Sequence, residues 1–321
     1  MKKDIMQAVA ETGILPVINI TDLSDAKPLA KAILDGGIGV LEITLRSEAS
    51  LQAITQITES YPDLQILAGT VLTVEQAQAA LDAGASGLVM PGYDEEIVDF
   101  AIQKNVPIVP GCITAADIQR GYKKGLRVFK FFPAECSGGL AAIKLLAGPF
   151  KGAKFLPTGG MTYENIGTYL KESCILACGG SYMADAKLLA SKQFDTITEN
   201  CKRARKIALG FELAHVGINH TSPEDSMNTA KAICSLFGLE LRPMNSATFA
   251  GTAVECVNAN GMGTHGHIGF FTNSIERAIS YFEGCGIQLN TDGAKRDKNG
   301  RITCVYLADE IAGFAFHVVC K

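Results

Sequence analysis

The sequence predicts an α/β chain in two parts: a (β/α)8 barrel, then a smaller α+β domain of two βαβββ modules. Short apolar strands alternate with alanine-rich helical stretches up to about residue 183, and this rhythm ends after Gly210. The second part carries a weak repeat, in which the segment at His215 recurs 52 residues later at His267. Eight strand–helix alternations favour a closed parallel barrel, with a doubly wound open sheet as the alternative.

Length and composition limit the function classes. The chain has 321 residues, of which 47% are apolar and 19% charged, enough to fill two folded cores. A net charge of −4 without a basic stripe argues against nucleic acid as a partner. The apolar runs are strand-sized and no apolar stretch follows the first lysines, so we expect neither a membrane span nor a secretory signal. Ten scattered cysteines without a CxxC pair favour reduced thiols in the cytoplasm over disulfides or a zinc–cysteine site.

The barrel is expected over residues 1–208, with helices at Leu23–Leu34, Val74–Ala83 and Gln193–Leu209. Gly210 provides a stop for the last of these helices. The eight predicted strands are Ile14–Ile20, Val40–Leu45, Gln65–Val71, Gly87–Pro91, Pro107–Pro110, Val128–Pro133, Phe155–Gly159 and Ile175–Gly179.

The second domain is expected over residues 212–321, with the boundary near 206–212. Each module begins with a strand that contains a His-x-Gly sequence and continues into a helix, Pro223–Phe237 in the first and Ser274–Glu283 in the second. Further strand-like runs follow at 238–241 and Gly251–Val257 in the first copy, and at 286–289, Arg301–Leu307 and Gly313–Val319 in the second.

The second strand carries charges on one face. Side chains alternate along a strand, so Glu42, Thr44 and Arg46 share a face opposite the aliphatic residues of VLEITLR. If the aliphatic face packs under the helices, the polar face points into the barrel or its mouth, where an unused charge is costly. A functional site is therefore predicted, and a structural Glu–Arg pair is the alternative.

Lys130 lies within the apolar sequence VFKFFP. Burial favours the neutral amine over the ammonium, and a free amine in a pocket can form a Schiff base. The alternative is a lysine that extends to solvent at the strand end.

Two glycine pairs end the last two predicted strands. These are Gly159-Gly160 and Gly179-Gly180, the latter followed by Ser181. Glycines there let backbone N–H groups surround an anion, and these loops are the usual phosphate site of such barrels. Tight turns are the alternative use of the same residues.

Taken in order, the motifs VLEITLR, AGTV, PG at 91–92, PIVPG, FKFFPAE, GPF, PTGG and GGSYM carry a resemblance. Residues 5–208 resemble the 2-dehydro-3-deoxy-6-phosphogluconate aldolase family, also called 4-hydroxy-2-oxoglutarate aldolase. The resemblance implies a class I aldolase without a metal cofactor, a homotrimer, Lys130 as Schiff-base lysine and Glu42 as general acid and base. It also implies substrate-binding residues: Arg46 and Thr70 for the carboxylate, Pro91, Phe132 and Thr158 along the pocket, and Gly159, Gly160, Gly180 and Ser181 for phosphate. Cys112 departs from the small hydroxyl residue that is common in the family.

The expected substrate is a small 2-oxo acid, phosphorylated or not, cleaved to pyruvate and an aldehyde. The sequence ranks neither the two substrates nor the stereochemistry at C4. A catalytically inactive sugar-phosphate-binding regulator and a phosphate-binding isomerase are the rival hypotheses. A binder has no need of a buried lysine, and an isomerase needs a carboxylate base without a buried amine, so Lys130 counts against both.

In the second domain, His215, His267 and His317 lie in strand-like runs, and so does Glu255. Three imidazoles and a carboxylate from four strands can bind a divalent metal. Residues 212–321 resemble the vicinal oxygen chelate superfamily, in which the first and last strands of each module supply the ligands. His317 departs from that pattern, because a glutamate is common there. Structural histidines are the alternative, and an oligomerisation module, a ligand sensor or a second enzyme remain open for the domain.

Overall fold

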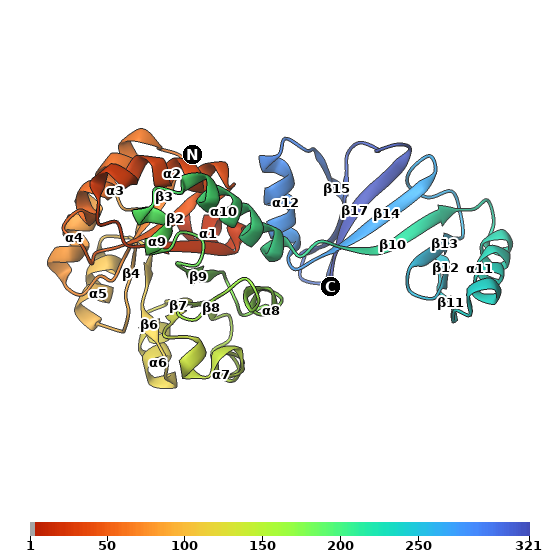
Figure 1. Ribbon diagram of the computed structural model, residues 1–321. Coiled ribbons are helices and arrows are strands. Elements are labelled where there is room, and N and C mark those ends of the chain that lie inside the picture. Colours follow the sequence, from red (N-terminus) through yellow and green to blue (C-terminus); the bar gives the residue numbers. More distant parts are fainter. Residues whose placement is uncertain (1–3) are drawn as a thin grey trace. The chain divides into compact units, whose positions relative to one another are not determined.

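The computed structural model describes residues 4–321 and divides between Ala208 and Leu209 into two compact units (Figure 1). The first unit alternates strands with helices, as an α/β fold does. Its strands are β1 (Ile14–Ile18), β2 (Val40–Thr44), β3 (Gln65–Gly69), β4 (Gly87–Val89), β5 (Ile108–Val109), β6 (Gly111–Cys112), β7 (Val128–Phe131), β8 (Lys154–Pro157) and β9 (Cys178–Gly180).

The helices of the first unit fill the intervals between its strands. They are α1 (Ile5–Thr12), α2 (Ala26–Asp35), α3 (Ser50–Ser60), α4 (Val74–Asp82), α5 (Glu95–Gln103), α6 (Ala115–Lys123), α7 (Gly139–Ala147), α8 (Ile166–Leu170), α9 (Ala186–Ala190) and α10 (Phe194–Leu209), with 3-10 turns η1 (Leu23–Asp25) and η2 (Glu135–Ser137). Among the described residues, no helix combines the length and apolarity needed to cross a bilayer.

The strands of the first unit are all parallel and pair around a ring. One ladder has the order β5-β4-β3-β2-β1-β9 and a second has β6-β7-β8. Two parallel bridges, Phe155 with Ile175 and Thr158 with Gly179, join β8 to β9. On the opposite side β5 and β6 are separated by Pro110, which lacks an N–H and whose carbonyl accepts from Lys130 N at 2.9 Å. The α/β class predicted from the sequence is confirmed.

Several predicted boundaries are corrected. The single strand expected at Pro107–Pro110 is the split pair β5 and β6, because proline interrupts the ladder. The eighth strand begins at Cys178, three residues later than predicted, and the helix expected at Leu23–Leu34 begins as the 3-10 turn η1. Most barrel strands end one or two residues earlier than predicted.

The second unit has eight strands and two helices: β10 (Glu212–Asn219), α11 (Pro223–Phe237), β11 (Leu241–Pro243), β12 (Ala247–Ala250), β13 (Val254–Val257), β14 (Gly266–Thr272), α12 (Ile275–Gly284), β15 (Leu289–Arg296), β16 (Ile302–Leu307) and β17 (Phe314–Cys320). One sheet contains all eight strands in the order β11-β12-β13-β10-β14-β17-β16-β15. The order is symmetric about the antiparallel pair β10 and β14. The run predicted at Gly251–Val257 contains only β13, so β12 was missed; Gly251, with a φ of +65°, separates the two strands.

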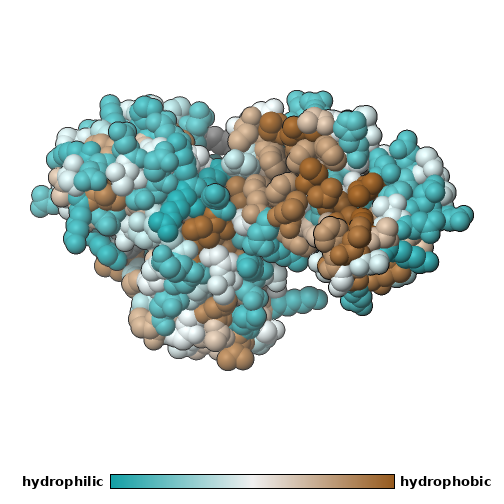
Figure 2. Space-filling view, turned by 45° about the vertical axis from the view of Figure 1, so that its right-hand side comes forward, coloured by the Kyte–Doolittle hydropathy of each residue, from teal (hydrophilic) through white to brown (hydrophobic). Residues whose placement is uncertain are grey.

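The two units differ in how much apolar surface they bury. The first has a continuous core that includes Phe129, Phe131 and Phe155. In the second, helix α12 covers a small core of Ile275, Ala278, Val305 and Val318. Figure 2 shows more apolar surface on the visible face of the second unit than on that of the first.

Candidate functional site

Lys130 and Glu42 form a buried ion pair inside the first unit. Lys130 projects from β7 and Glu42 from β2, and Lys130 Nζ lies 3.0 Å from Glu42 Oε1. Lys130 is 6% exposed and Glu42 is completely buried. Within residues 4–321, Glu42 Oε2 has no hydrogen-bond partner. A buried carboxylate with one oxygen unsatisfied is costly, so a structural ion pair alone explains it poorly.

Gly69 makes the space that the Glu42 side chain occupies. It is the last residue of β3, which pairs with β2 so that Thr44 lies beside it. A Cβ on Gly69 would lie 2.2 Å from Glu42 Oε1, closer than atoms in folded proteins approach. The glycine of the sequence AGTV is therefore required by the carboxylate on the neighbouring strand.

Arg46 and Thr70 come together just beyond the ends of β2 and β3. Arg46 Nε donates a hydrogen bond to Thr70 Oγ1 at 3.2 Å. Thr70 has a φ of +59°, in the left-handed region that β-branched residues rarely adopt. Such strain is concentrated at functional sites, and here it presents the threonine hydroxyl to the guanidinium.

A pocket of about 520 Å³ opens at this end of the barrel. Most of the predicted site residues line it: Arg46, Lys130, Phe132, Thr158, Gly159, Gly160, Gly180 and Ser181. Three others do not. Glu42 lies behind Lys130, Thr70 contacts Arg46, and Pro91 lies next to Gly111, whose Cβ would meet the Pro91 carbonyl oxygen at 2.1 Å.

Sequence reasoning missed several residues that line the pocket. Asn19, Asp22 and Lys192 lie in loops whose path the sequence does not reveal, and Asp25 ends the 3-10 turn η1. Lys192 Nζ is 2.9 Å from Asp22 Oδ2 and also binds Asp25, so its charge is compensated within the protein. Thr44 could have been found, since it shares the inward face of its strand with Glu42.

The glycine loops border the same pocket. Gly159 and Gly160 have φ values of +94° and +83°, which glycine adopts without strain. Three consecutive carbonyls of this loop, from Thr158 to Gly160, accept hydrogen bonds from Ala134 N, Glu135 N and Asn165 Nδ2. The loop is therefore held by its carbonyls.

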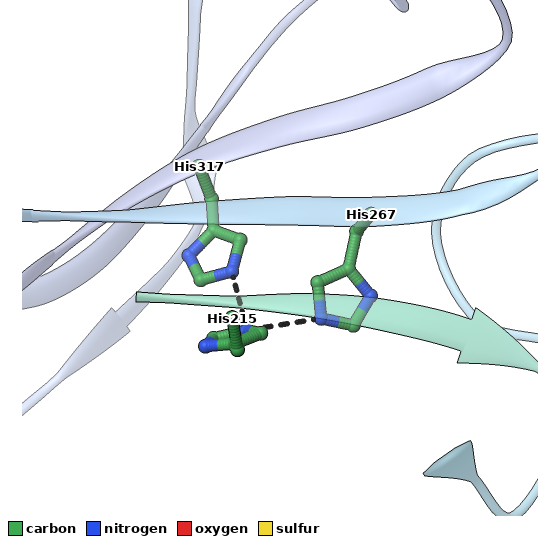
Figure 3. Close-up of side chains that lie close together, drawn as sticks. All are labelled: His215, His267 and His317. Atoms are coloured by element: carbon green, nitrogen blue, oxygen red, sulfur yellow. Dashed lines mark hydrogen bonds between the residues drawn. The ribbon is translucent and has the colours of Figure 1, made fainter. Parts of the chain in front are cut away.

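In the second unit, the four predicted ligands meet on one side of the sheet, and Figure 3 shows the three imidazoles turned toward one another. They come from β10, β13, β14 and β17. His215 Nε2 lies 3.2 Å from His267 Nε2 and 3.1 Å from His317 Nε2. Glu255 Oε2 lies 3.1 Å from His267 Nε2 and 3.3 Å from His215 Nε2.

Two glycines make room for these imidazoles. In the antiparallel pairing of β10 and β14, Gly217 lies opposite His267 and Gly269 opposite His215. A Cβ on Gly217 would lie 2.0 Å from His267 Cε1, and one on Gly269 would lie 2.6 Å from His317 Nε2. Each module's glycine thus accommodates the other module's histidine.

Burial disfavours the protonated form of two of these histidines, His215 and His317. Burial, with His215 and His267 nearby, lowers the pKa of His317 to about 3. Burial also lowers the pKa of His215. Burial alone would raise the pKa of Glu255, but the hydrogen bond to His267 and the charges of both histidines lower it overall. Neutral imidazoles and an ionised carboxylate are the forms in which these side chains bind metals.

The second nitrogen of His317 is also engaged. Cys304 Sγ lies 3.2 Å from His317 Nδ1, and the Tyr306 ring lies 4.7 Å from the imidazole, centroid to centroid. These contacts from β16 fix the orientation of the ring, so that Nε2 points into the cluster.

Comparisons with known proteins match the first unit. The family model for KDPG and KHG aldolase matches residues 5–200. The 2-dehydro-3-deoxy-phosphogluconate aldolase of Treponema pallidum (strain Nichols) is 41% identical over 194 residues, covering 60% of this chain and 92% of the relative. The KHG/KDPG aldolase of Escherichia coli (strain K12) is 38% identical over 212 residues, covering 66% and 98%.

Two solved structures are similar to the same part. The KDPG aldolase of Legionella pneumophila, with pyruvate captured as a covalent carbinolamine intermediate, has a TM-score of 0.61 at 34% identity and covers 64% of this chain and 99% of its own. The 2-keto-3-deoxy-6-phosphogluconate aldolase of Zymomonas mobilis ZM4 with 3-phosphoglycerate has a TM-score of 0.60 at 37% identity, covering 64% and 97%. With a family match over more than half its length, the chain belongs to the KDPG and KHG aldolase family.

Proposed function

We propose that this chain is a class I aldolase that cleaves a 2-oxo acid through a Schiff base on Lys130. The substrates are 2-dehydro-3-deoxy-6-phosphogluconate, which gives pyruvate and glyceraldehyde 3-phosphate, and 4-hydroxy-2-oxoglutarate, which gives pyruvate and glyoxylate. The observation that carries the proposal is the buried Lys130–Glu42 pair at the pocket, with 3.0 Å between Nζ and Oε1. The names of the relatives support the reaction class.

Catalysis begins with the amine. Lys130 gives up its proton to the adjacent Glu42 carboxylate, and the free amine adds to the C2 ketone of the substrate. Glu42 returns that proton to the hydroxyl of the carbinolamine, which leaves as water, so that an iminium and an ionised Glu42 remain. The iminium withdraws electrons from the C3–C4 bond. The lysine supplies this electron sink, so the reaction needs no metal in the first unit.

Glu42 then carries out the proton transfers that accompany cleavage of the C3–C4 bond. As a carboxylate it removes the C4 hydroxyl proton, directly or through a water, and the C3–C4 bond breaks to release the aldehyde. The enamine that remains on Lys130 takes a proton from Glu42 at C3, and hydrolysis of the resulting iminium releases pyruvate. Because Glu42 Oε1 lies 3.0 Å from Lys130 Nζ, Glu42 is close to C3 and to the C4 hydroxyl of a substrate bound to Lys130.

Binding residues orient the substrate for this chemistry. Arg46 holds the carboxylate of the pyruvate portion, fixed from behind by Thr70, and thereby directs the ketone toward Lys130. Phe132 and Thr158 line the reacting end, and Pro91 supports the wall. Gly159, Gly160, Gly180 and Ser181 surround the phosphate of the larger substrate.

Borohydride trapping with pyruvate tests the proposal. Peptide mass mapping is expected to find the reduced adduct on Lys130 and on no other lysine. Lys130→Ala abolishes both adduct and cleavage, and Glu42→Gln slows cleavage by about 10²- to 10⁴-fold. Near-normal turnover by Lys130→Ala would rule out the mechanism. A folded wild-type protein without any adduct would favour the binding-regulator hypothesis.

For the second unit we propose a divalent metal site formed by His215, Glu255, His267 and His317, in a domain related to the vicinal oxygen chelate superfamily. The symmetric strand order about β10 and β14 supports the relationship. The residues present fit a metal ion, because ligands around one zinc ion at about 2.0–2.1 Å lie about 3.0–3.4 Å apart. Four of the six distances between these ligand atoms are 3.1–3.3 Å.

The chemistry such an ion supplies is polarisation of a bound oxygen. The chain's own part is to hold the ion: Glu255 offsets its charge, and Cys304 with Tyr306 orients His317. Equilibrium titration of EDTA-treated protein with Zn²⁺, Mn²⁺ or Fe²⁺ is expected to show one site per chain, lost in His317→Ala. His220→Ala is the matched control, since within residues 4–321 the His220 ring bonds to Ile218 O and Thr229 Oγ1 and not to the cluster. Equal binding by all three proteins would contradict the site.

Two properties implied by the resemblance remain predictions. Light scattering on the purified protein tests the homotrimer, and cell fractionation tests the cytoplasmic location.

A further inference from the structure

The loop at Gly159–Gly160 is fixed by its carbonyl oxygens. Thr158 O accepts from Ala134 N at 2.8 Å, and Gly159 O accepts from Glu135 N at 3.1 Å. Gly160 O accepts from Asn165 Nδ2 at 2.9 Å. Three successive peptide groups are thus attached on one side, by two backbone amides and one side chain.

A peptide group is planar and trans, so its N–H points opposite to its C=O. The carbonyl anchors therefore turn the N–H groups of Gly160 and Met161 away from Glu135 and Asn165. Both residues line the pocket, and neither N–H donates a hydrogen bond within residues 4–321. Two free amides on adjacent residues form a cradle for an anion.

Of the three residues that bind the loop carbonyls, Asn165 differs because it uses its side chain. Ala134 and Glu135 use backbone N–H groups. At these two positions only a substitution by proline would remove the donor. Asn165 uses its carboxamide: Nδ2 donates to Gly160 O, while Oδ1 accepts from Thr162 N at 2.8 Å. It thus holds the peptide groups on both sides of Met161.

The positively charged side chains near the pocket contribute little to the binding of an anion at these amides. The cations that line the pocket are Arg46, Lys130 and Lys192 among the described residues. Lys192 is bound to Asp22 and Asp25, and Lys130 is bound to Glu42. Attraction of a distal anion therefore depends on correctly oriented peptide groups.

We propose that Asn165 is a positioning residue that sets the preference for a phosphorylated over an unphosphorylated substrate. It touches neither substrate nor reacting atoms, and it acts by orienting the Gly160–Met161 peptide toward the phosphate. The inference rests on the proposed aldolase function and adds a determinant of its specificity.

Two substitutions separate the effects of the side chain. Asn165→Ala removes both bonds without adding charge. Asn165→Asp keeps an acceptor for Thr162 N, removes the donor to Gly160 O and adds a negative charge, so its loss of phosphate affinity is expected to be at least that of Asn165→Ala. The matched control is Asn200→Ala, because Asn200 Nδ2 also holds a loop carbonyl, that of Met183, at 3.1 Å. The amide of that peptide, Ala184 N, already donates to Ser181 O and is not free for an anion.

Two measurements provide the test: kcat/KM for both substrates, and the Kd of inorganic phosphate by titration calorimetry. Both Asn165 variants are expected to lower the ratio of kcat/KM, phosphorylated over unphosphorylated, by about tenfold, the effect of one charge-assisted hydrogen bond. Phosphate affinity falls by a similar factor, and Asn200→Ala changes neither quantity.

Equal losses for both substrates, or unchanged phosphate affinity in Asn165→Ala, would overturn the proposal. A wild-type protein that cleaves neither substrate would refute the aldolase function instead. In that case the phosphate titration alone still decides whether Asn165 orients an anion site.

Discussion

The substitution Gly69→Ala is expected to disable catalysis although it replaces neither residue of the proposed Lys130–Glu42 pair. The new methyl group would lie 2.2 Å from Glu42 Oε1, 2.7 Å from Cγ and 2.8 Å from Cδ. Glu42 is completely buried, so its side chain cannot move into solvent. It must shift within the barrel, and the 3.0 Å contact with Lys130 is lost.

The expected magnitudes follow from that displacement. Loss of a positioned general acid and base reduces kcat by about 10²- to 10⁴-fold. Overpacking of one methyl group in a close-packed interior lowers the free energy of unfolding by about 1–3 kcal/mol. The protein therefore remains folded while turnover collapses. Pyruvate release, coupled to NADH oxidation by lactate dehydrogenase, measures kcat, and urea denaturation measures stability.

Two comparisons make the test specific. Gly39→Ala lies one residue before β2, where a Cβ meets no atom within 4 Å, and we expect near-normal activity. If Gly69→Ala acts through Glu42, the double variant with Glu42→Gln is no slower than Glu42→Gln alone. Wild-type turnover in folded Gly69→Ala would refute the reasoning, and so would multiplicative losses in the double variant.

Three further expectations concern the substrate carboxylate, the metal site and pH. Thr70→Val removes only the acceptor of the Arg46 Nε bond, so steady-state kinetics should show KM for the oxo acid raised about two- to tenfold with kcat nearly unchanged. Gly269→Ala pushes against His317 and His215, and calorimetry should show weakened metal binding, whereas Gly284→Ala, which meets no atom, leaves it intact. Folding lowers the pKa of His317 to about 3, so below about pH 6.5 the unfolded chain binds one more proton than the folded chain. The free energy of unfolding of the metal-free second unit should therefore fall by up to about 1.4 kcal/mol per pH unit between about pH 6.5 and about pH 3. Hydrogen exchange of the amides in β14 and β17 measures this fall, and its absence would contradict the expectation.

Most strand positions and the Lys130–Glu42 pair could be predicted because each leaves a local signal. A charge within an apolar strand is conspicuous, and period-two alternation assigns it to a face, so Glu42 and Lys130 stand out in VLEITLR and VFKFFP. Their 3.0 Å contact joins strands that are 88 residues apart, which closure of the barrel makes possible. The site could therefore be predicted only together with the fold class, which brings the two strands together.

Other features depend on contacts that no local pattern encodes. Asn165 lies in an ordinary polar loop, and its role emerges only when its carboxamide is seen on Gly160 O. The pairing of Lys192 with Asp22 joins segments 170 residues apart. Strand β12 was missed because the predicted run began only at Gly251, the residue that separates β12 from β13.

The second unit shows how a repeat can contain more information than its individual residues. Taken alone, His-x-Gly at 215–217 and again at 267–269 suggests only two similar strand starts. If the two copies pair antiparallel, each histidine must lie opposite the other copy's glycine, as His215 with Gly269 and His267 with Gly217 do. Only a residue without a Cβ leaves room for the facing imidazole, and a third histidine from β17 uses the space above Gly269. The glycines are thus part of the histidine cluster, and a search for such sites should look for the pair His-x-Gly in repeated strands, not for histidines alone.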